Sequence, residues 1–332
     1  LLKGAEALEQ ESSVFSRLLQ NELKTGATFP AARLAALKAI YSGSQDAEFL
    51  DSLSAPNNIL GLEYCKAILR QNASLMPVAI LRKGDGYHDA ISGVGEDSGQ
   101  KPLTFASATG IRTALFQQFP YGLPERSDAD ASCRFPALSF LPETVRDLFC
   151  QSKPLWPEDF SSLLNGKILE LSQAEDRGAA EFGKISDISS DLALRLSRLA
   201  LDITGWEDRI AQLKTRQYTY TRINRAFTKI LLGIAKEPIA AWKDLGYAPY
   251  ARILGFNKGA APLFAELKKS SRIPLITKPA AAFSCLSGPA LEEFQKDLYA
   301  SHLYQCAFCQ RYPDAGHAVL KNEFNRKLLV LE

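Results

Sequence analysis

The sequence predicts two parts of different fold class: an α/β part that holds half of a doubly wound parallel sheet, followed by a mainly α-helical part. A short apolar run at residues 76–81, bounded by polar residues, is typical of a buried parallel strand, and helical spacing of apolar residues precedes and follows it. Beyond residue 142 the pattern is almost wholly helical. Because residues 120–142 are rich in Pro, Gly, Ser and Asp, we place the domains at 1–119 and 120–332.

Length and composition narrow the possibilities. The 332 residues suffice for two domains with cores. The first residue is Leu1 and the only methionine is Met76, so we expect a piece of a longer polypeptide. No apolar run approaches the length of a membrane span and no secretory leader is visible, so we expect a cytoplasmic protein with no membrane partner.

The first part begins with three predicted helices, at residues 1–24, 30–41 and 56–70. Gly26 follows the first helix at the position where glycine commonly ends one, and Pro30 is tolerated in the first turn of the second. In the third helix we expect a buried stripe formed by Leu60, Tyr64, Ala67 and Ile68.

Two asparagines, Asn57 and Asn58, stand at the start of the helix at 56–70. Helix capping is the commonest use of Asn at such a position, but one cap needs only one Asn. The other carboxamide is then free to offer a donor and an acceptor together to a nucleotide base. We therefore include Asn57 among the candidate nucleotide-binding residues.

The predicted strand at 76–81 leads into a basic loop, Arg82-Lys83-Gly-Asp-Gly86. Ligands of open α/β sheets bind beyond the carboxyl ends of the strands. Arg82 and Lys83 are therefore candidates for contact with a phosphate or nucleotide, and the alternative is that they are simply solvated.

The stretch Ser107-Ala-Thr-Gly-Ile-Arg112 opens the next predicted helix, at residues 107–118. Backbone N–H groups at a helix N-terminus lack intrahelical partners and the helix dipole is positive there, which favours an anion. Ser107 and Thr109 lie in this first turn, and Arg112 can reach the same anion with several donors. The stretch is thus predicted to hold a nucleotide's phosphates, although Ser107 could serve only as an N-cap.

The second part is predicted to contain successive helices at residues 142–150, 157–172, 189–205, 219–233 and 291–306. Short strands are expected at 273–278 and in the tail at 326–332. On the helix at 189–205 we expect one apolar face, formed by Leu192, Leu196, Leu199 and Ile203.

Charge is distributed unevenly along the chain. Residues 209–278 contain 14 Lys or Arg and three acidic residues, a net charge of +11, whereas the whole chain carries +2. The remainder of the chain therefore carries a net charge of −9. Such asymmetry indicates that one region binds an anionic surface, either a nucleic acid or a membrane.

The basic region forms a ridge on the predicted helix at 219–233. Arg222, Arg225 and Lys229 are spaced three and four residues apart and so share one face, while Ile223, Phe227 and Ile230 face the core. Cations can neutralise phosphates, and tyrosines can stack on exposed bases. The full candidate set for nucleic-acid contact is Lys214, Arg216, Tyr218, Tyr220, Arg222, Arg225, Lys229 and Arg252.

The six cysteines are scattered, which fits reduced thiols better than a disulfide scaffold. Cys306 and Cys309 form a Cys-x-x-Cys with His302 before it and His317 after it, so a zinc site is conceivable. The segment 302–306 has the pattern of a continuous amphipathic helix, however, and the spacing matches no standard zinc finger. We therefore predict no metal site.

Four motifs, taken in order, resemble bacterial tRNA(Met) cytidine acetate ligase. They are Pro56-Asn-Asn-Ile-Leu-Gly-Leu-Glu-Tyr64, Arg82 with Tyr87-His-Asp89, Ala106-Ser-Ala-Thr-Gly-Ile-Arg112, and Leu213-Lys-Thr-Arg-Gln-Tyr-Thr-Tyr-Thr-Arg222. Any one of them alone would be weak, but four in the right order are specific. The similarity begins near residue 21 and thins after the basic region.

The resemblance implies a Rossmann-like nucleotidyltransferase domain joined to a helical tRNA-binding part. It implies an enzyme that uses ATP, with Mg²⁺, to convert acetate to acetyl-adenylate and then acetylates N4 of the wobble cytidine of elongator tRNA(Met). Asn57 and Arg82 match family positions that contact ATP. On the physical argument above, Lys83, Ser107, Thr109 and Arg112 would lie at the phosphate end, and the basic ridge would take the tRNA.

One feature of the family does not occur in this sequence. The family's His-x-Gly-His motif stabilises adenylyl transfer, but the three histidines here, His88, His302 and His317, stand apart. We therefore assign no catalytic residue and expect this chain to be catalytically incomplete alone. Two alternatives stay open: a non-catalytic module that binds structured RNA, and a small-molecule adenylyltransferase.

Overall fold

The structure is a computed structural model that describes residues 12–27, 29–40, 56–80, 106–118, 140–314 and 322–331, together with positions 2, 5, 6, 9 and 138. It divides into two compact units, Leu1–Pro154 and Leu155–Glu332. Residues 119–137 lie outside the described part, so the assignment of functional domains at 1–119 and 120–332 stays a prediction.

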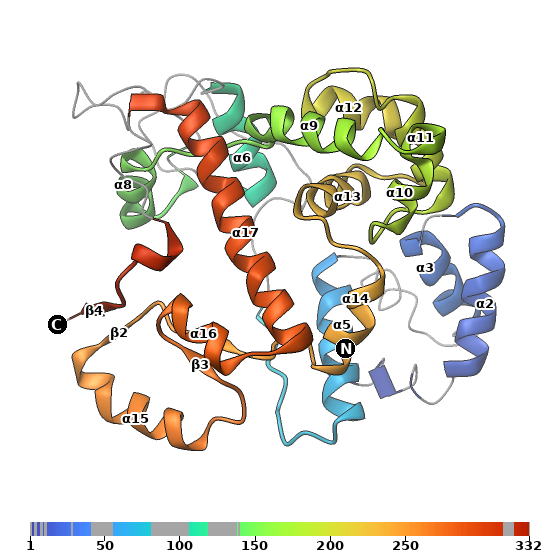
Figure 1. Ribbon diagram of the computed structural model, residues 1–332. Coiled ribbons are helices and arrows are strands. Elements are labelled where there is room, and N and C mark those ends of the chain that lie inside the picture. Colours follow the sequence, from blue (N-terminus) through green and yellow to red (C-terminus); the bar gives the residue numbers. More distant parts are fainter. Residues whose placement is uncertain are drawn as a thin grey trace, which may run out of the picture. The chain divides into compact units, whose positions relative to one another are not determined.

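The first unit consists of helices in its described part (Figure 1). They are α2 (Ser12–Lys24), α3 (Phe29–Ile40), α5 (Pro56–Arg70), α6 (Ala108–Gln118) and α8 (Glu143–Gln151). A small core joins the first three and contains Ala5, Leu37, Leu62 and Cys65, with Phe15 and Leu69 packed against it. Arg33 of α3 donates to the Glu63 carboxylate of α5 at 3.0 Å and ties the two helices together. These helices match the expected ones, except that for the first, expected at 1–24, only the part from Ser12 to Lys24 is described as a continuous helix.

The buried face of α5 differs from the expected one. Leu62 and Cys65 are buried, whereas Leu60 is 53% exposed and Tyr64 is also exposed. The helix carries apolar residues on two faces, and its contacts with α2 and α3 cover only the face that bears Leu62. Our predicted stripe was therefore wrong, because spacing alone could not say which of the two faces packs.

The predicted strand at 76–81 is also not found. Residues 73–80 form no helix or strand and belong to no sheet among the described residues, and residue 81 lies outside them. Met76, Val78 and Ile80 are all strongly exposed, Ile80 at 92%. A parallel strand requires a partner from elsewhere in the chain, and the described residues of this unit supply none.

The second unit is mostly helical, as expected. Its helices are η2 (Pro157–Phe160), α9 (Ser161–Leu171), η3 (Glu175–Gly178), α10 (Ala179–Lys184), α11 (Ser190–Arg198), α12 (Trp206–Leu213), α13 (Tyr220–Leu232), α14 (Glu237–Asp244), η4 (Lys258–Ala260), α15 (Ala261–Ser270), α16 (Pro279–Cys285), α17 (Gly288–Arg311) and η5 (Glu323–Asn325). Its strands are β1 (Ala251–Arg252), β2 (Gly255–Asn257), β3 (Leu275–Ile276) and β4 (Leu329–Leu331).

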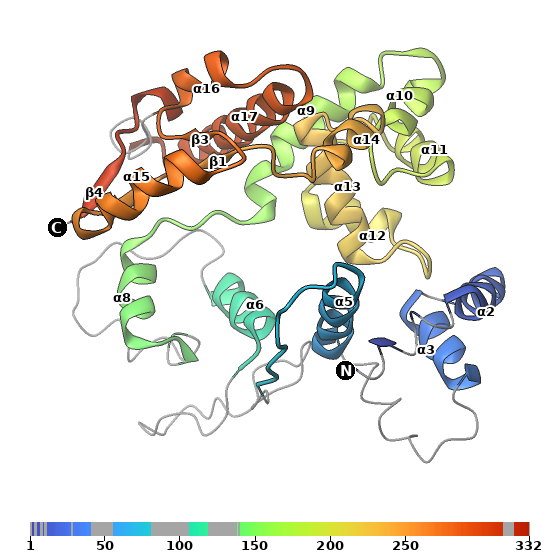
Figure 2. The same ribbon diagram turned by 90° about the horizontal axis from the view of Figure 1, so that it is seen from below.

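Two separate cores stabilise this unit. Helices α9 to α13 enclose a large core that includes Phe182, Leu192, Trp206 and Phe227. A smaller core, with Ile276 and Phe294 at its centre, lies among β3, α16 and α17. In both views α17 runs between the α9–α13 bundle and the part that contains α15, α16 and the strands (Figures 1 and 2). Two short parallel pairs, β1 with β3 and β2 with β4, complete that part.

One helix of the bundle ends earlier than expected. Helix α11 stops at Arg198 rather than near Gly205, and Ile203, which we expected in the core, is exposed. The cause is Arg209, whose guanidinium donates to the carbonyls of Leu199 and Asp202 just beyond the helix end. Gly205 instead becomes the N-cap of α12. Within the described part of the chain, no helix has the length and apolar character needed to span a bilayer.

Candidate nucleic-acid interface

The first turn of α6 contains the predicted phosphate-binding residues. The Ser107 hydroxyl is buried and accepts a hydrogen bond of 2.9 Å from the backbone N–H of Gly110, which is N-cap geometry. Thr109 is half-buried, and the Arg112 side chain extends over it with Nη2 at 3.5 Å from the Thr109 hydroxyl. Arg112 itself is exposed, so its remaining donors face solvent at the positive end of the helix.

The remaining predicted nucleotide residues are only partly placed. Asn57 is exposed in the first turn of α5. Arg82 and Lys83 lie outside the described residues. The structure therefore positions four of the six candidates on two helix N-termini, and their grouping into one ATP site stays a prediction.

Helix α13 forms the rigid support of the predicted ridge. Ile223, Phe227 and Ile230 are buried on its inner face, where the Phe227 ring meets Trp206 edge-on at 5.3 Å. The helix begins after Thr219 and ends at Gly233, whose φ of +60° is the left-handed geometry that glycine adopts without strain. Lys296 of α17 donates to the carbonyls of Leu232 and Gly233 at 2.9 and 3.1 Å, and so fixes the end of the helix.

Arg222 is held over the ring of Tyr218, with its guanidinium carbon 4.9 Å from the ring centroid. Tyr218 is only 5% exposed, and its hydroxyl shares a 2.7 Å hydrogen bond with Ser189, the N-cap of α11. The expected stacking of Tyr218 on a base is therefore not available in this structure, because burial leaves its ring inaccessible. The ring instead packs against the Arg222 guanidinium.

Arg225 and Lys229 both contact the carboxylate of Asp187. Arg225 Nε and Lys229 Nζ lie 3.1 and 3.0 Å from Asp187 Oδ2, and Lys229 also donates to the Ser186 hydroxyl at 2.9 Å. Burial by itself raises the pKa of the Asp187 carboxyl, but the hydrogen bonds and charges of Lys229 and Arg225 outweigh it and hold the pKa below its ordinary value. The Arg225 side chain is still 63% exposed, so it retains access to solvent.

Asp187 reaches α13 because two loops pair beside it. Ile185 forms an antiparallel bridge with Ala235, and the N–H groups of Ser186 and Lys236 bond across to the carbonyls of Ile234 and Lys184. This pairing forms a surface hollow of about 470 Å³, lined by Asp187, Ile188, Ser189, Arg222, Arg225 and Lys236. We name it the α13 hollow. Lys236 was not among the predicted residues, because it follows Gly233 and falls outside the helical spacing.

The entrance of the ridge carries three more predicted residues. Lys214 and Arg216 are exposed and form no ion pair within the described part of the chain. The Tyr220 hydroxyl donates to Glu207 at 2.7 Å, and burial together with this carboxylate raises the tyrosine pKa above its ordinary value. Tyr220 thus stays a neutral donor with a partly exposed ring.

Arg252 does not extend the ridge as expected. It lies in β1, beside the smaller core, and pairs with the buried carboxylate of Glu323. Ser301 donates to that carboxylate and Arg326 lies 3.3 Å from it. Burial alone raises the Glu323 pKa, but these partners outweigh it and lower the pKa. Arg252 is therefore committed to holding the end of the chain, a role that sequence spacing could not reveal.

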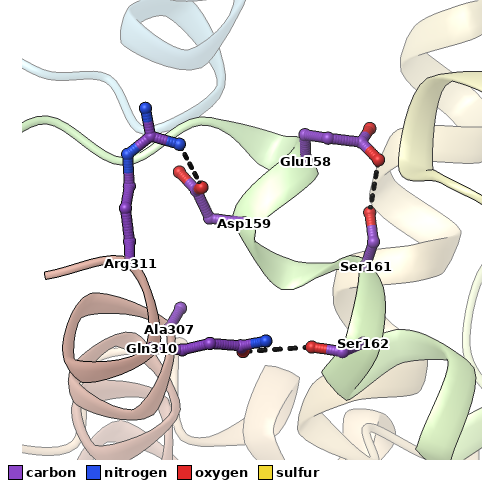
Figure 3. A pocket seen from close by; sticks show the side chains of 7 residues that line it. All are labelled: Glu158, Asp159, Ser161, Ser162, Ala307, Gln310 and Arg311. Atoms are coloured by element: carbon purple, nitrogen blue, oxygen red, sulfur yellow. Dashed lines mark hydrogen bonds and ion pairs between the residues drawn. The ribbon is translucent and has the colours of Figure 1, made fainter. Parts of the chain in front are cut away.

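A second polar hollow, of about 280 Å³, lies between η2, α9 and the end of α17 (Figure 3). Arg311 points toward Asp159 with 2.5 Å between Nη1 and Oδ1, and the Ser162 hydroxyl donates to Gln310 at 3.0 Å. The Glu158 carboxylate accepts from the Ser161 hydroxyl and from the N–H of Trp206, and so caps α12. These polar groups join structural elements to one another, so we assign this hollow no ligand.

The cysteine motif lies on continuous helix, as predicted. Cys306 and Cys309 are free thiols within α17. His302 lies on the same helix, four residues before Cys306. Among the described residues, no group of three or more His, Cys, Asp or Glu side chains could hold a metal ion.

Comparison with protein families gives one match over most of the chain. The family described as HIGH Nucleotidyl Transferase matches residues 1–317. Two curated relatives, from Bacillus velezensis and Bacillus subtilis, are named tRNA(Met) cytidine acetate ligase. They are 32% and 31% identical to this chain over 308 residues. In each case 91% of this chain aligns, but it spans only 65% of the relative's length.

Solved structures with a similar fold come from Thermotoga maritima. TmcAL in its apo form has a TM-score of 0.76 and 22% sequence identity, over 99% of this chain and 73% of that one. TmcAL bound with alpha-thio ATP has a TM-score of 0.74 at the same identity and coverage. At this identity the likeness bears on the fold, which is of the nucleotidyltransferase type.

Proposed function

The chain belongs to the HIGH nucleotidyl transferase family, and from that premise we propose that it is the larger, C-terminal part of an ATP-dependent tRNA(Met) cytidine acetate ligase. The names of its relatives support the proposal. The observation that carries it at the level of residues is the ridge on α13, a row of cations on the outer face of a helix whose inner face is buried.

The proposed reaction has two steps. Acetate attacks the α-phosphate of ATP, which gives acetyl-adenylate and releases pyrophosphate. N4 of the wobble cytidine in elongator tRNA(Met) then attacks the acetyl carbonyl, AMP leaves and the amine loses a proton. The products are N4-acetylcytidine, AMP and pyrophosphate.

We assign the ATP to the first unit. Asn57 would contact the base, and Arg82, Lys83, Ser107, Thr109 and Arg112 would form the phosphate end. The positive end of α6 and the solvent-facing donors of Arg112 support the second assignment. Mg²⁺ would accompany the ATP phosphates, and we assign it no protein ligand.

We assign the tRNA to the second unit, which carries the charge excess of +11 between residues 209 and 278. Lys214, Arg216 and Tyr220 at the entrance and Arg222 and Arg225 on α13 would contact the RNA backbone, and Lys229 would support this surface through Asp187. Tyr218 would act through Arg222. A substrate as small as a mononucleotide needs no basic surface of this length, which disfavours a small-molecule adenylyltransferase.

The ridge is tested by measuring the affinity of this chain for elongator tRNA(Met) over a series of salt concentrations. Changing Arg222 and Arg225 together to Ala should weaken binding on the order of tenfold and reduce the slope of log affinity against log salt by roughly one per lost phosphate contact. ATP affinity should not change. Unaltered tRNA binding, with ATP binding lost, would mean that the two surfaces have been exchanged.

The enzymatic part is tested by ATP–pyrophosphate exchange with acetate. The chain contains no His-x-Gly-His motif, so we propose that the 332 residues alone do not catalyse exchange. A full-length protein that includes such a motif should catalyse it and should add an acetyl mass to elongator tRNA(Met). In that protein Asn57→Ala and Arg82→Ala should impair exchange and leave tRNA binding near normal. Exchange by the 332-residue chain would contradict the proposed incompleteness, and tRNA binding by a full-length protein that never acetylates would favour an RNA-binding module.

A further inference from the structure

The α13 hollow brings together three cations from two segments of the chain. Arg222 and Arg225 come from α13 and Lys236 from the loop after it, and Asp187 is the one acid among the lining residues. Lys229, which is not among the lining residues, also contacts Asp187. The lining residues therefore sum to +2, and the single carboxylate is already neutralised from two sides. An anion is the chemical complement of such a hollow.

The donors of Arg222 are oriented but uncommitted. Its guanidinium carbon lies 4.9 Å from the centroid of the Tyr218 ring, and a cation–π contact of this kind uses none of the five N–H donors of the guanidinium. No carboxylate lies within ion-pair distance of Arg222 among the described residues. Because Tyr218 is itself fixed by Ser189, this orientation is set before any ligand arrives.

Lys236 adds a cation that the helical spacing does not predict. Its backbone N–H bonds to the carbonyl of Lys184 at 2.8 Å, and its ammonium donates to the carbonyl of Gly183 at 2.5 Å. These contacts hold the side chain beside the hollow without neutralising its charge. Its two remaining N–H donors can therefore reach an oxyanion.

Asp187 occupies an unusual backbone position at the edge of the hollow. Its φ of +65° places it in the left-handed region, which Asp adopts more readily than most residues. The surrounding loop holds it there, with Oδ2 against Arg225 and Lys229. In this arrangement the carboxylate presents to Arg225 the same kind of oxygen that a phosphate would present.

We infer that the α13 hollow is a subsite for one phosphodiester group of an RNA backbone, bound by Arg222 and Lys236, with Asp187 as the internal anion that the phosphate replaces at Arg225. The inference rests on the proposed RNA-binding function of the second unit and adds Lys236 and Asp187 to it. Lys229 keeps Asp187 partnered after the exchange, because it contacts both Asp187 and Ser186.

The test measures binding of fluorescently labelled elongator tRNA(Met) to the 332-residue chain over a salt series. Lys236→Gln should weaken binding by roughly three- to tenfold and lower the salt slope by about 0.7 to 0.9. Lys243→Gln, the same substitution at an exposed lysine of α14 outside the hollow, should change neither quantity. Equal effects of the two substitutions, or none at Lys236, would overturn the inference.

Asp187→Asn should act in the opposite direction. Removing the competing carboxylate should tighten tRNA binding by about two- to threefold at low salt and steepen the slope. Asp208→Asn, with the same charge change at an exposed residue of α12 outside the hollow, should have a smaller effect. Weaker binding by Asp187→Asn would contradict the role of Asp187 as an exchangeable anion. Thermal unfolding verifies that each variant is folded, and Lys236→Gln retains the test if Asp187→Asn is not.

The same assay separates this inference from the proposed function. If the unaltered chain binds tRNA with a steep salt slope and Lys236→Gln does likewise, the subsite is wrong and the ridge stands. If the unaltered chain shows no salt-dependent tRNA binding, the proposed function fails. Inorganic phosphate should displace the tRNA no better than potassium chloride at equal ionic strength, and stronger displacement would reassign the hollow to free phosphate.

Discussion

The bundle of α9 to α13 and the helices of the first unit differ in how completely they cover their apolar residues. In the bundle, neighbouring helices enclose Leu192, Trp206 and Phe227 entirely. In the first unit, Leu60 and Tyr64 on one face of α5 and the side chains from Leu75 to Ile80 are exposed. Antiparallel helices close a core with segments adjacent in sequence, whereas a parallel strand needs partners far along the chain. The comparison teaches that the described segments bury the centre of the bundle, whereas they leave one face of α5 and the side chains from Leu75 to Ile80 exposed.

The largest effect on stability is expected for Arg209→Ala in the bundle. Arg209 is 1% exposed and donates to the carbonyls of Leu199 and Asp202 and to the Asn165 carboxamide. Its removal leaves buried acceptors without donors, so we expect a loss of about 3 to 5 kcal/mol in the free energy of unfolding. Arg195→Ala, at an exposed arginine of α11 paired with Asp191, should cost less than about 1 kcal/mol.

Urea unfolding, monitored by tryptophan fluorescence, measures the free energy of unfolding of the second unit, which contains the bundle. The three tryptophans, Trp156, Trp206 and Trp242, all lie in the second unit. A loss at Arg209 no larger than that at Arg195 would show that the guanidinium does not support the bundle.

Gly205→Ala should have the next largest effect. A Cβ at Gly205 would lie 2.4 Å from the Glu158 carboxylate that caps α12, so the cap must move and about 1 kcal/mol should be lost. Gly166→Ala within α9 meets nothing within 4 Å and should gain up to about 1 kcal/mol from helix propensity. Urea unfolding of the two variants should thus give opposite signs, and a shared sign would refute the capping role of Glu158.

The stability of the second unit should depend on pH through the Glu323 carboxylate. Its folded-state pKa lies below the ordinary value of 4.5, so the stabilisation is fully present above pH 4.5 and is lost as the pH falls through the lowered pKa. Glu323→Gln should flatten this part of the stability curve, measured by urea unfolding at successive pH values. If Glu323→Gln and the unaltered chain lose stability equally at acid pH, the contacts of Arg252 and Ser301 with Glu323 do not persist in solution.

The smallest effect is expected at the exposed segment of the first unit. Ile80→Ser should change the free energy of unfolding, measured by thermal unfolding, by less than about 0.5 kcal/mol, because the side chain is 92% exposed. Ile223→Ala in α13 removes a fully buried side chain and should cost about 2 to 5 kcal/mol. A cost above about 1 kcal/mol at Ile80 would show that the segment is covered in solution, and would remove the contrast between the two regions.

Sequence reasoning succeeded where the signal was local. The start and end of α13 and its division into a buried and a basic face followed from spacing and from Gly233. The N-cap at Ser107 was one of two interpretations of the same residues, and its hydrogen bond to Gly110 is compatible with both. Local patterns therefore located α13, its buried face and the start of α6 correctly.

It failed where distant segments decide the outcome. Tyr218 is buried by its contact with Ser189, 29 residues earlier, and Arg252 is paired with Glu323, 71 residues later. Lys236 and Asp187 meet only because Ile185 and Ala235 form a bridge. None of these pairings leaves a periodic signal, so the α13 hollow could not have been deduced from the sequence.

The contact of Lys296 with the end of α13 has a consequence for biosynthesis. The ammonium that binds the last carbonyls of this helix comes from 64 residues further along the chain. A nascent chain on the ribosome therefore displays the basic ridge before the C-terminal cation that fixes its helix has been translated. The polypeptide therefore acquires the final geometry of this surface only after α17 has been translated and has folded against α13.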